Sequence, residues 1–270
     1  MELWNILREV GLENRMEILR MLRRKPATVS ELRLNLRKAG VSKPYVTVSR
    51  YLENMKRGGL LSERDGKFYL SVAGRLFLSY ADEMEEKLKV IGGFWEHLHH
   101  PIDYLPEEFI RRIDVLRHAR VLTDQYSIIL ETLKGLEMAE EEVLVIAGTT
   151  ISPEYVLASF KRSLDGIKEK IINDSSIVEQ DKNVYLETIR KLGLRDWEIR
   201  KIKKNRRVRK YENLVLRVMV VDDRMAGISL PEAGRSEAIV PAFQSEDEEF
   251  IAWVKDIFRW YWERATPVEW

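Results

Sequence analysis

Apolar side chains recur with a helical period in three blocks over the first sixty residues of this 270-residue chain. In the third block they predict a helix whose buried stripe comprises Tyr45, Val48, Leu52 and Met55. Ser42 is placed to cap this helix, Pro44 suits its first turn, and the glycine pair at 58–59 suits its end. The pattern therefore predicts a helix from about residue 43 to residue 57.

The two earlier blocks and the residues that follow complete a recognisable order of elements. Residues 14–24 form one predicted helix, and Thr28 begins a second, because Glu31 stands three positions later as a capping box requires. Two short runs, 60–64 and 67–70, then flank an Asp-Gly pair, which is a strong signal for a two-residue hairpin. This order predicts a winged helix-turn-helix.

The outward face of the third predicted helix and the tip of the hairpin carry side chains suited to DNA. A short basic and polar face fits the major groove, and a basic hairpin tip fits the phosphate backbone. We therefore predict DNA contacts by Lys43, Tyr45, Val46, Thr47, Arg50, Asn54, Arg64 and Lys67. The alternatives are a helical bundle with a solvated basic face and a winged helix that contacts only proteins.

A longer helix is predicted from Ala73 to Ile91, ending at the glycine pair 92–93. Its apolar positions step at helical spacing through Leu76, Phe77, Tyr80, Met84, Leu88 and Ile91. We predict that this stripe forms a homodimer, and packing against its own domain is the alternative. A short helix is also expected at residues 2–9.

Strands and helices alternate after the glycine pair, which predicts an α/β domain with a largely parallel core and an antiparallel edge. The predicted helices are 106–116, 126–138, 153–164, 177–192 and 246–264. The predicted strands are 119–123, 143–147, 167–172, 197–202, 214–221 and 224–230. Trp253 and Trp260 widen the apolar stripe of the last helix, so we predict core positions, with pocket lining as the alternative.

Several stretches of the sequence resemble known regulator families. Residues 48–52, 59–61 and 66–75 are typical of the winged-helix domains of archaeal ArsR-type regulators. The remainder resembles the effector domain named from an archaeal methanogenesis or filament regulator, through the stretches 94–97, 105–109, 221–224, 227–230 and 261–267. The alternation of elements is also similar to one half of a phospholipase-D-like fold, as in TrmB-type regulators. The resemblance implies a sugar or sugar phosphate as the effector.

No recognised catalytic or metal motif accompanies this pattern. The chain has no Cys, which excludes disulfides and thiolate metal sites. His97, His99 and His100 cluster, but no partner with ligand spacing follows, so we predict neither a metal nor a cofactor. None of the four histidines is followed two residues later by Lys, as phospholipase-D chemistry requires, and the nucleophile-elbow, P-loop and dinucleotide motifs are missing. We predict that the chain is not an enzyme.

Two segments of the predicted α/β domain are candidates for ligand binding. The first is the end of the strand at 143–147 and the start of the next helix, because ligands of α/β sheets lie at the carboxyl ends of strands. The second is the stretch 200–210, with eight basic residues in eleven. We expect it to be a solvated connection between strands, and the alternative is a patch that binds anions or contacts DNA. The predicted ligand residues are Thr149, Thr150, Ser152, Arg200 and Arg224, although 222–224 is expected mainly as a charged turn.

Charge and composition change this picture in one respect. The near-neutral total hides an asymmetry, since residues 1–75 carry 16 Lys/Arg against 8 Asp/Glu, or +8, and residues 76–270 carry 29 against 36, or −7. Basic charge concentrated on the predicted DNA-binding domain favours DNA binding through the release of counterions.

No run of apolar residues is long enough to span a membrane, and the N-terminus does not resemble a signal peptide, so a cytoplasmic location is expected.

The sequence thus predicts a cytoplasmic, homodimeric transcriptional regulator of the α/β class that binds double-stranded DNA. Its parts are a DNA-binding domain at 1–72, a linking dimer helix at 73–92 and an effector domain at 93–270 that senses a small polar or anionic molecule. The alternatives are a DNA-associated scaffold that binds a protein partner and an enzyme with an unrecognised α/β site.

Overall fold

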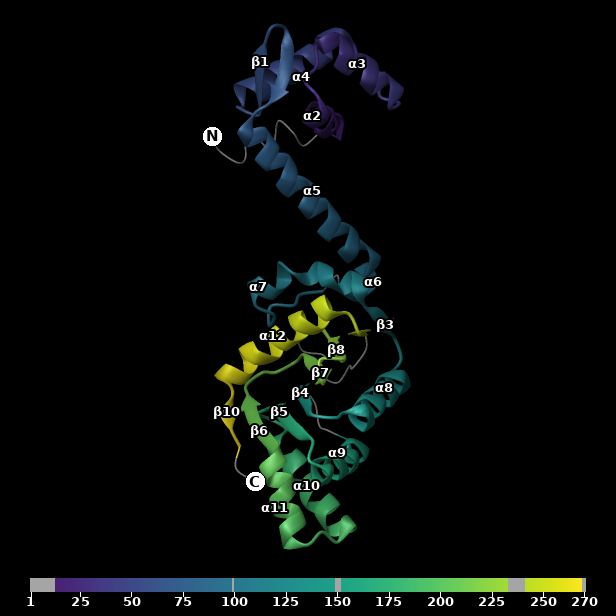
Figure 1. Cartoon of the computed structure of the whole chain (residues 1–270), viewed down its shortest axis with the longest axis vertical. Helices are drawn as coiled ribbons and strands as arrows, with labels where there is room; N and C mark the ends of the chain where they lie inside the picture. The colour runs from purple at the N-terminus through teal and green to yellow at the C-terminus, as the bar shows by residue number, and fades with distance from the viewer. Residues whose placement is uncertain (1–12, 99, 149–151, 233–240, 269–270) are drawn as a thin grey trace. The chain divides into compact units, whose positions relative to one another are not determined.

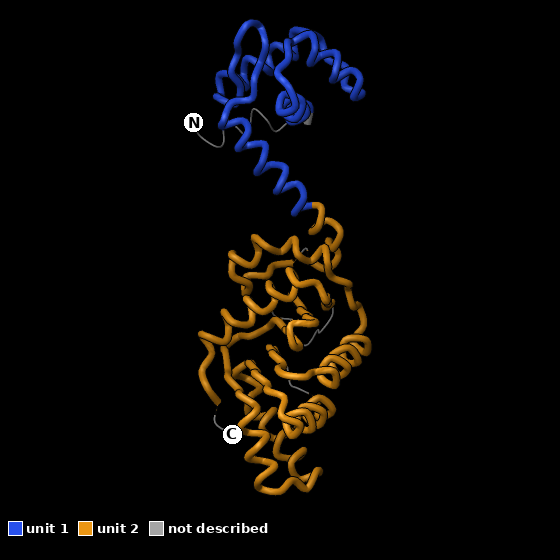
Figure 2. The backbone as a smooth tube through the Cα atoms, in the orientation of Figure 1, with its two compact units in different colours: residues 1–88 blue, residues 89–270 orange. Residues whose placement is uncertain are grey.

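The computed structural model describes residues 13–98, 100–148, 152–232 and 241–268, and the chain divides into two compact units (Figures 1 and 2). The first unit comprises residues 1–88 and the second residues 89–270. The helix expected at 2–9 lies outside the described residues. Within the described ranges, no helix combines the length and the apolarity needed to cross a bilayer.

Within its described residues, 13–88, the first unit contains three helices, a hairpin and most of a fourth helix, as the sequence predicts for this part of the chain. Its elements are α2 (Glu13–Arg24), α3 (Val29–Lys38), α4 (Tyr45–Arg57), β1 (Leu61–Arg64), β2 (Lys67–Leu70) and α5 (Val72–Gly93). The capping box at the start of α3 is confirmed, because Thr28 accepts from the backbone N–H of Glu31 while the Glu31 carboxylate accepts from the backbone N–H of Thr28. The apolar sides of α2, α3 and α4 meet the hairpin in one core.

Two details of the predicted third helix are wrong. The helix begins at Tyr45 with Pro44 as its N-cap, so Ser42 does not cap it. The buried stripe contains Tyr51 in place of Tyr45, which is 46% exposed. The guanidinium of Arg15 lies 4.6 Å from the centre of the Tyr51 ring, a contact that favours the inward position of this side chain.

The hairpin forms as the Asp-Gly pair predicts. Leu61 pairs with Leu70 and Arg64 with Lys67 in an antiparallel ladder. Asp65 and Gly66 have φ values of 53° and 70°, and a type I′ turn needs positive φ at both positions. Asp tolerates this conformation better than most residues, and Gly adopts it freely.

The second unit is a mixed α/β domain built on one eight-stranded sheet. Its helices are α6 (Trp95–Leu98), α7 (Glu107–Ile110), the 3₁₀ helix η1 (Ile113–His118), α8 (Gln125–Met138), α9 (Pro153–Asp165), α10 (Val178–Leu192), α11 (Asp196–Asn205) and α12 (Glu248–Arg264). Its strands are β3 (Arg120–Leu122), β4 (Glu142–Ala147), β5 (Lys168–Asp174), β6 (Arg206–Tyr211), β7 (Arg217–Val221), β8 (Met225–Ser229), β9 (Ala242–Ser245) and β10 (Thr266–Pro267).

The order of the strands is β10-β6-β5-β4-β7-β8-β9-β3, and only β6, β5 and β4 are parallel. The pairs from β4 to β3 are all antiparallel, and so is the pair of β10 with β6. Five of the seven strand pairs are therefore antiparallel, and the prediction of a largely parallel core with an antiparallel edge is wrong. Strand β9 was not predicted, because its four residues form too short a run to show alternation. Ile146 lies opposite Val218, so β7 starts at the edge of the sheet where the parallel strands end.

The two faces of this sheet have different helical cover. Helix α12 lies across one face, where Phe250, Val254 and Ile257 pack on inward residues of the strands. Trp253 is fully buried in the same core and donates a hydrogen bond to the carbonyl of Phe109, which confirms the prediction of a core position. Helices α8 to α11 lie on the other face, and Figure 1 shows the strands between them and the yellow α12.

The basic stretch at 200–210 is not a connection between strands. Its first half belongs to α11 and its second half is β6, so the strand predicted at 197–202 is a helix. Arg206 explains the change, because its side chain is fully buried and its Nε lies 2.6 Å from an oxygen of Glu169 on β5. Burial alone would lower the pKa of Arg206, but the charge of Glu169 raises it well above the usual range.

The predicted helix at 106–116 is also divided, into α7 and η1. The remaining predicted helices and the strands β3, β4, β5, β7 and β8 occur within a few residues of their expected bounds.

The Glu169–Arg206 pair is completed by aromatic and hydroxyl partners. Glu169 accepts hydrogen bonds from Tyr155 and Ser159, and Arg206 lies 4.7 Å from the centre of the Tyr185 ring. The cluster therefore joins β5 and β6 to α9 and α10 through buried polar groups. Buried charges of this kind are tolerated only when they are paired.

We predict that Glu169→Ala destabilises the second unit by about 3–5 kcal/mol, because it leaves the charge of Arg206 buried without Glu169. The double variant Glu169→Leu with Arg206→Met should recover much of this loss, since it replaces the pair by apolar groups. Urea unfolding followed by tryptophan fluorescence measures both, because six of the seven tryptophans lie in residues 89–270. A double variant no more stable than Glu169→Ala would contradict the explanation.

Candidate functional site

Within the first unit, α4 has a buried side and an outward side. Val48, Leu52 and Met55 have essentially no exposed surface, whereas Val46 is 75% exposed and Arg50 is also exposed. The predicted DNA residues Lys43, Thr47 and Asn54 are half-buried, and Asn54 accepts a hydrogen bond from Arg57. The outward side of the helix therefore offers a methyl-bearing and basic surface to a partner.

Other basic residues of the first unit have intramolecular partners. Arg20 and Arg23 on α2 contact Asp82 on α5 at 3.0 and 2.6 Å. Lys56 contacts Glu63 on β1 at 2.7 Å and thereby fixes the hairpin to the end of α4. The basic residues of the first unit thus include one group that forms ion pairs within the unit and another on its outward surface.

The tip of the hairpin carries the other predicted DNA contacts. Arg64 and Lys67 pair across the turn and both are exposed. The Nε atom of Arg64 lies 3.6 Å from Asp65, but both side chains are more than 80% exposed, so water screens this ion pair. The tip is thus a basic projection next to the C-terminal end of α4.

The second unit contains a cavity of about 400 Å³ between α8 and the sheet. Its floor comes from residues of β4, β7, β8 and β9, and its roof from α8. Ala147 at the end of β4 and Ser152 at the start of α9 both line it. The cavity therefore lies beside the strand end that the sequence singles out for ligand binding.

The predicted ligand residues do not all meet at this cavity. Ser152 lines it and caps α9 by accepting from the backbone N–H of Tyr155. Thr149 and Thr150 lie outside the described residues. Arg200 is exposed on α11, and Arg224 follows Val221, which pairs with Val143 at the opposite end of β4 from Ala147.

Sequence reasoning missed Arg217, which lines the cavity from the first position of β7. Burial lowers the pKa of Arg217 to about 10, so the side chain keeps its charge at neutral pH. The signal was present in the sequence, because Arg217 interrupts the apolar run 214–221 at a position whose alternate neighbours Met219 and Val221 face the α8 side of the sheet.

The acidic turn after β7 has a structural role. Asp222 accepts hydrogen bonds from the backbone N–H groups of Glu140, Glu141 and Glu142, at the start of β4. Burial by itself raises the pKa of Asp222, but these hydrogen bonds and the charge of Arg224 lower it below its ordinary value. Arg224 pairs with Glu140 at 2.6 Å, so the expected charged turn with internal ion pairs is what the structure shows.

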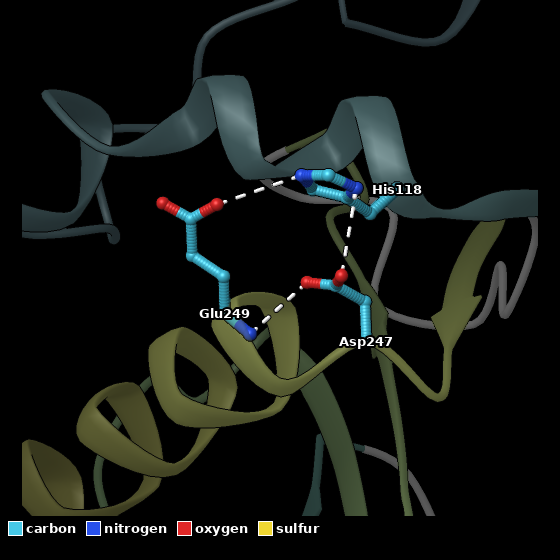
Figure 3. A group of neighbouring side chains, drawn as sticks. All are labelled: His118, Asp247 and Glu249. Carbon is cyan, nitrogen blue, oxygen red and sulfur yellow. Dashed lines mark hydrogen bonds and ion pairs between the residues drawn. The ribbon is translucent and has the colours of Figure 1, made fainter.

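One group of side chains has the composition of a metal site. His118, Asp247 and Glu249 bring one ligand atom each to within 4.8 Å of one another (Figure 3). The two nitrogens of the ring face different carboxylates, with Nδ1 3.6 Å from Asp247 and Nε2 3.5 Å from Glu249. One ring nitrogen ligates one ion, so these two contacts to different carboxylates do not by themselves define a metal site.

Both carboxylates of this group also have other partners. Asp247 caps α12 by accepting from the backbone N–H groups of Glu249 and Phe250, and Glu249 contacts Arg117 at 2.9 Å. The group joins η1 to the start of α12. It is separate from the predicted histidine cluster, in which His99 lies outside the described residues and His100 contacts the carbonyl of Pro101.

Comparison with known proteins places the chain in no family. No protein-family model matches the sequence, and no curated protein matches it. Among solved structures, the archaeal chromatin protein TrmBL2, described as showing a novel mode of DNA binding, aligns over 90% of this chain and 89% of its own at 16% identity and a TM-score of 0.42.

Two further solved structures align with 56% of this chain and 98% of their own. NucT from Helicobacter pylori has 17% identity and a TM-score of 0.42, and the phospholipase D family member Nuc from Salmonella typhimurium has 10% identity and a TM-score of 0.41. At such TM-scores these likenesses decide neither the family nor the function of the chain.

We predict that Asp222→Asn lowers the stability of the second unit by on the order of 1 kcal/mol at neutral pH. The pKa of Asp222 is lowered by folding, so its contribution is present above about pH 4 and is lost as the pH falls through the folded value. The gap between wild type and variant should therefore stay constant from pH 8 to 5 and narrow below pH 4.

Urea unfolding at a series of pH values measures this gap. Asp223→Asn is the matched control, because Asp223 contacts Lys255 at the surface and accepts none of the three backbone hydrogen bonds. A gap that does not change down to pH 3 would show that the carboxylate charge of Asp222 is irrelevant.

Proposed function

We propose that this chain is a sequence-specific DNA-binding transcriptional regulator that acts as a homodimer and senses a small molecule. The first unit would act as a winged helix-turn-helix, with α4 as the recognition helix and the β1–β2 hairpin as the wing. The observation that carries the proposal is the outward side of α4. There Val46 and Arg50 are exposed although the opposite side of the same helix is fully buried.

Charge supports the same proposal. Residues 1–75 have a net charge of +8, and the contacts of Arg20, Arg23 and Lys56 within the unit leave Arg50 and Lys67 among the basic side chains on its surface. Release of counterions from DNA phosphates would drive binding, and the affinity would fall steeply with salt. A helical bundle with a solvated basic face would not require some basic residues to be paired within the unit and others to be exposed on one side.

Arg50 and Arg64 should have different roles. Arg50 lies on the exposed side of α4, where a bidentate contact to a guanine edge is the commonest specific interaction. Arg64 lies at the hairpin tip, where contact with phosphate is expected. Base contacts set sequence preference, whereas phosphate contacts set affinity for all sequences.

We predict that Arg50→Ala costs about 1–3 kcal/mol on the preferred site and relaxes the preference at one position of that site. Arg64→Ala should weaken binding to every sequence about equally and reduce the salt dependence. Selection from a random DNA library gives the preferences, and fluorescence anisotropy at several salt concentrations gives the affinities.

Lys191→Ala is the matched control for loss of one exposed cation, because this residue lies on α10 in the second unit. If Arg50→Ala lost affinity with its sequence preference unchanged, Arg50 would not read bases. If all three variants weakened DNA binding alike, only overall charge would matter.

The dimer is proposed to form through α5. Leu76, Tyr80, Met84 and Leu88 recur every fourth residue of this helix, and each is more than half exposed. Apolar side chains in such a row are expected to be covered, and a second copy of the same helix supplies a matching surface. Phe77 instead packs on the core of the first unit and Ile91 on that of the second, so the proposed interface excludes them.

We predict that Leu76→Glu with Tyr80→Glu yields monomers in sedimentation equilibrium, with weaker binding to a two-fold site. Both positions are exposed, so the helical content should stay unchanged in circular dichroism. Ser79→Glu adds charge to an exposed polar position of the same helix and serves as the control. A double variant that stayed dimeric would place the interface elsewhere.

The sensing role is assigned to the second unit because a ligand-sized cavity lies at the end of its parallel strands. A ligand there regulates DNA binding only if it prefers one conformation of the protein, and a coupling of about 1–3 kcal/mol suffices. Binding of a small molecule without any chemical change to it, together with altered DNA affinity, is the result that separates this role from a scaffold or an enzyme.

A further inference from the structure

We infer that the cavity beneath α8 binds a monocarboxylic acid with an apolar body, whose carboxylate is held by Arg217. This inference deepens the sensing role proposed above and rests on it for its biological meaning. Binding of the acid to the cavity can be tested independently of the sensing role. Three features of the cavity support the inference: its apolar walls, the cation Arg217 on the sheet, and the glycine Gly227 in its floor.

The cavity exists because the antiparallel half of the sheet has incomplete cover on the α8 side. Side chains that alternate along β7 and β8 place Met219 and Met225 on this face, and Met225 reaches Gly135 of α8, where an added Cβ would lie 2.5 Å from its terminal carbon. This contact fixes the C-terminal half of α8 close to the strands. The N-terminal half, with Gln125 and Ile128, lies over the cavity.

Most of the wall is hydrocarbon. Ile128, Leu133, Val145 and Met219 contribute apolar side chains from α8, β4 and β7. A volume of about 400 Å³ lies in the range of small-molecule sites. Burial of an apolar body against such walls gives binding energy of roughly 25 cal/mol per Å² of apolar surface, before the cost of immobilising the ligand.

Arg217 supplies a positive charge at one end of this wall. Its neighbour across the ladder is at the end of β4, since Val218 pairs with Ile146, so the guanidinium belongs to the edge where the parallel strands finish. Burial lowers the pKa of Arg217 to about 10, so the guanidinium stays charged at neutral pH. A carboxylate is the common ligand group that matches the two-pronged donor geometry of a guanidinium.

The acidic residue of the lining does not oppose this assignment. Glu131 contacts Lys134 at 3.0 Å and Arg120 as well, and Gln244 donates to the same carboxylate. Its charge is therefore balanced by its own partners. Arg217 also has interactions within the chain, and a guanidinium has five N–H donors, so a carboxylate would be an additional partner.

The walls argue against the sugar that the resemblance to TrmB-type regulators implies. A sugar carries a hydroxyl group on most of its carbons, and each buried hydroxyl needs a hydrogen-bond partner. Several polar residues of the lining already take part in hydrogen bonds within the chain, namely Ser152, Tyr155, Ser229 and Gln244. A ligand with one polar end and an apolar body meets the lining with fewer unsatisfied groups.

Gly227 provides a way to close the cavity without disturbing the fold. It lies in the middle of β8 and lines the cavity, and the nearest atom to an added Cβ is the carbonyl oxygen of Phe243 at 3.7 Å. This is an ordinary van der Waals distance, so valine can be accommodated. Valine also favours strands more than glycine does, and Gly227→Val should retain or raise the melting temperature.

The experiment uses the full-length chain and isothermal titration calorimetry with two probes. Decanoate is the carboxylate probe, and decanol, which has the same chain length and no charge, is its matched control. Decanoate should bind at least tenfold more tightly than decanol. The heat-capacity change should be negative for decanoate, because apolar surface is buried.

Three variants locate the binding. Arg217→Gln should weaken decanoate by about 10- to 100-fold, the usual effect of a charged hydrogen bond, and leave decanol unchanged. Arg217→Lys should restore part of the difference, since it keeps the charge. Gly227→Val should abolish binding of both probes. Circular dichroism and thermal melting confirm that each variant is folded.

The outcomes separate this inference from the proposed function. Decanoate binding that is absent in wild type, or unaffected by both Arg217→Gln and Gly227→Val, overturns the inference and leaves the DNA-binding proposal standing. Decanoate binding with the expected dependence on Arg217 and Gly227 supports it, even if the affinity for DNA does not respond. In that last case the sensing role fails while the site remains.

Discussion

Every strand of the eight-stranded sheet has two faces to bury, and the chain supplies unequal cover for them. On one side α12 brings a continuous apolar surface that includes a fully buried tryptophan, Trp253. The other side is covered by the four helices α8 to α11, and among the described helices it is α8 that lies over the antiparallel half. Because β7 and β8 alternate strictly, their second face must then carry Met219, Met225 and Arg217 towards a space that one helix does not fill. The cavity follows from this inequality.

The charged side chains also divide into those paired within the chain and those exposed at its surface. In the second unit, the buried pair of Glu169 and Arg206 costs desolvation that its mutual attraction and its hydroxyl and aromatic partners offset. In the first unit, Arg20 and Arg23 gather on Asp82, so α2 and α5 are joined by ion pairs that are partly shielded from water. The exposed cations near α4 and the hairpin are separate from these contacts, and the proposed DNA binding is assigned to them.

Local signals were predicted well, and long-range ones were not. The capping box at Thr28, the Asp-Gly turn and most helices follow from rules that involve residues close in sequence. The prediction for the basic stretch 200–210 was wrong, because Arg206 is a core residue that pairs with Glu169, a residue distant in the sequence. The predicted burial of Tyr45 was wrong for a similar reason, since Tyr51 takes the buried position and contacts Arg15. Ser152 was found from the βα turn, whereas Arg217 was missed although it interrupts the apolar run 214–221.

The cavity also indicates how a ligand could act on the protein. Helix α8 is held at Glu131, which pairs with Arg120 and Gln244, and at Gly135, which approaches Met225 closely. Its first turn is fixed mainly by its own cap, Asp124, which accepts from the backbone N–H of Ser127. A ligand that fills the space between this turn and the strands adds contacts where the helix has few. It therefore favours conformations in which α8 lies close to the sheet, and such a difference in stability between conformations is the physical requirement for regulation.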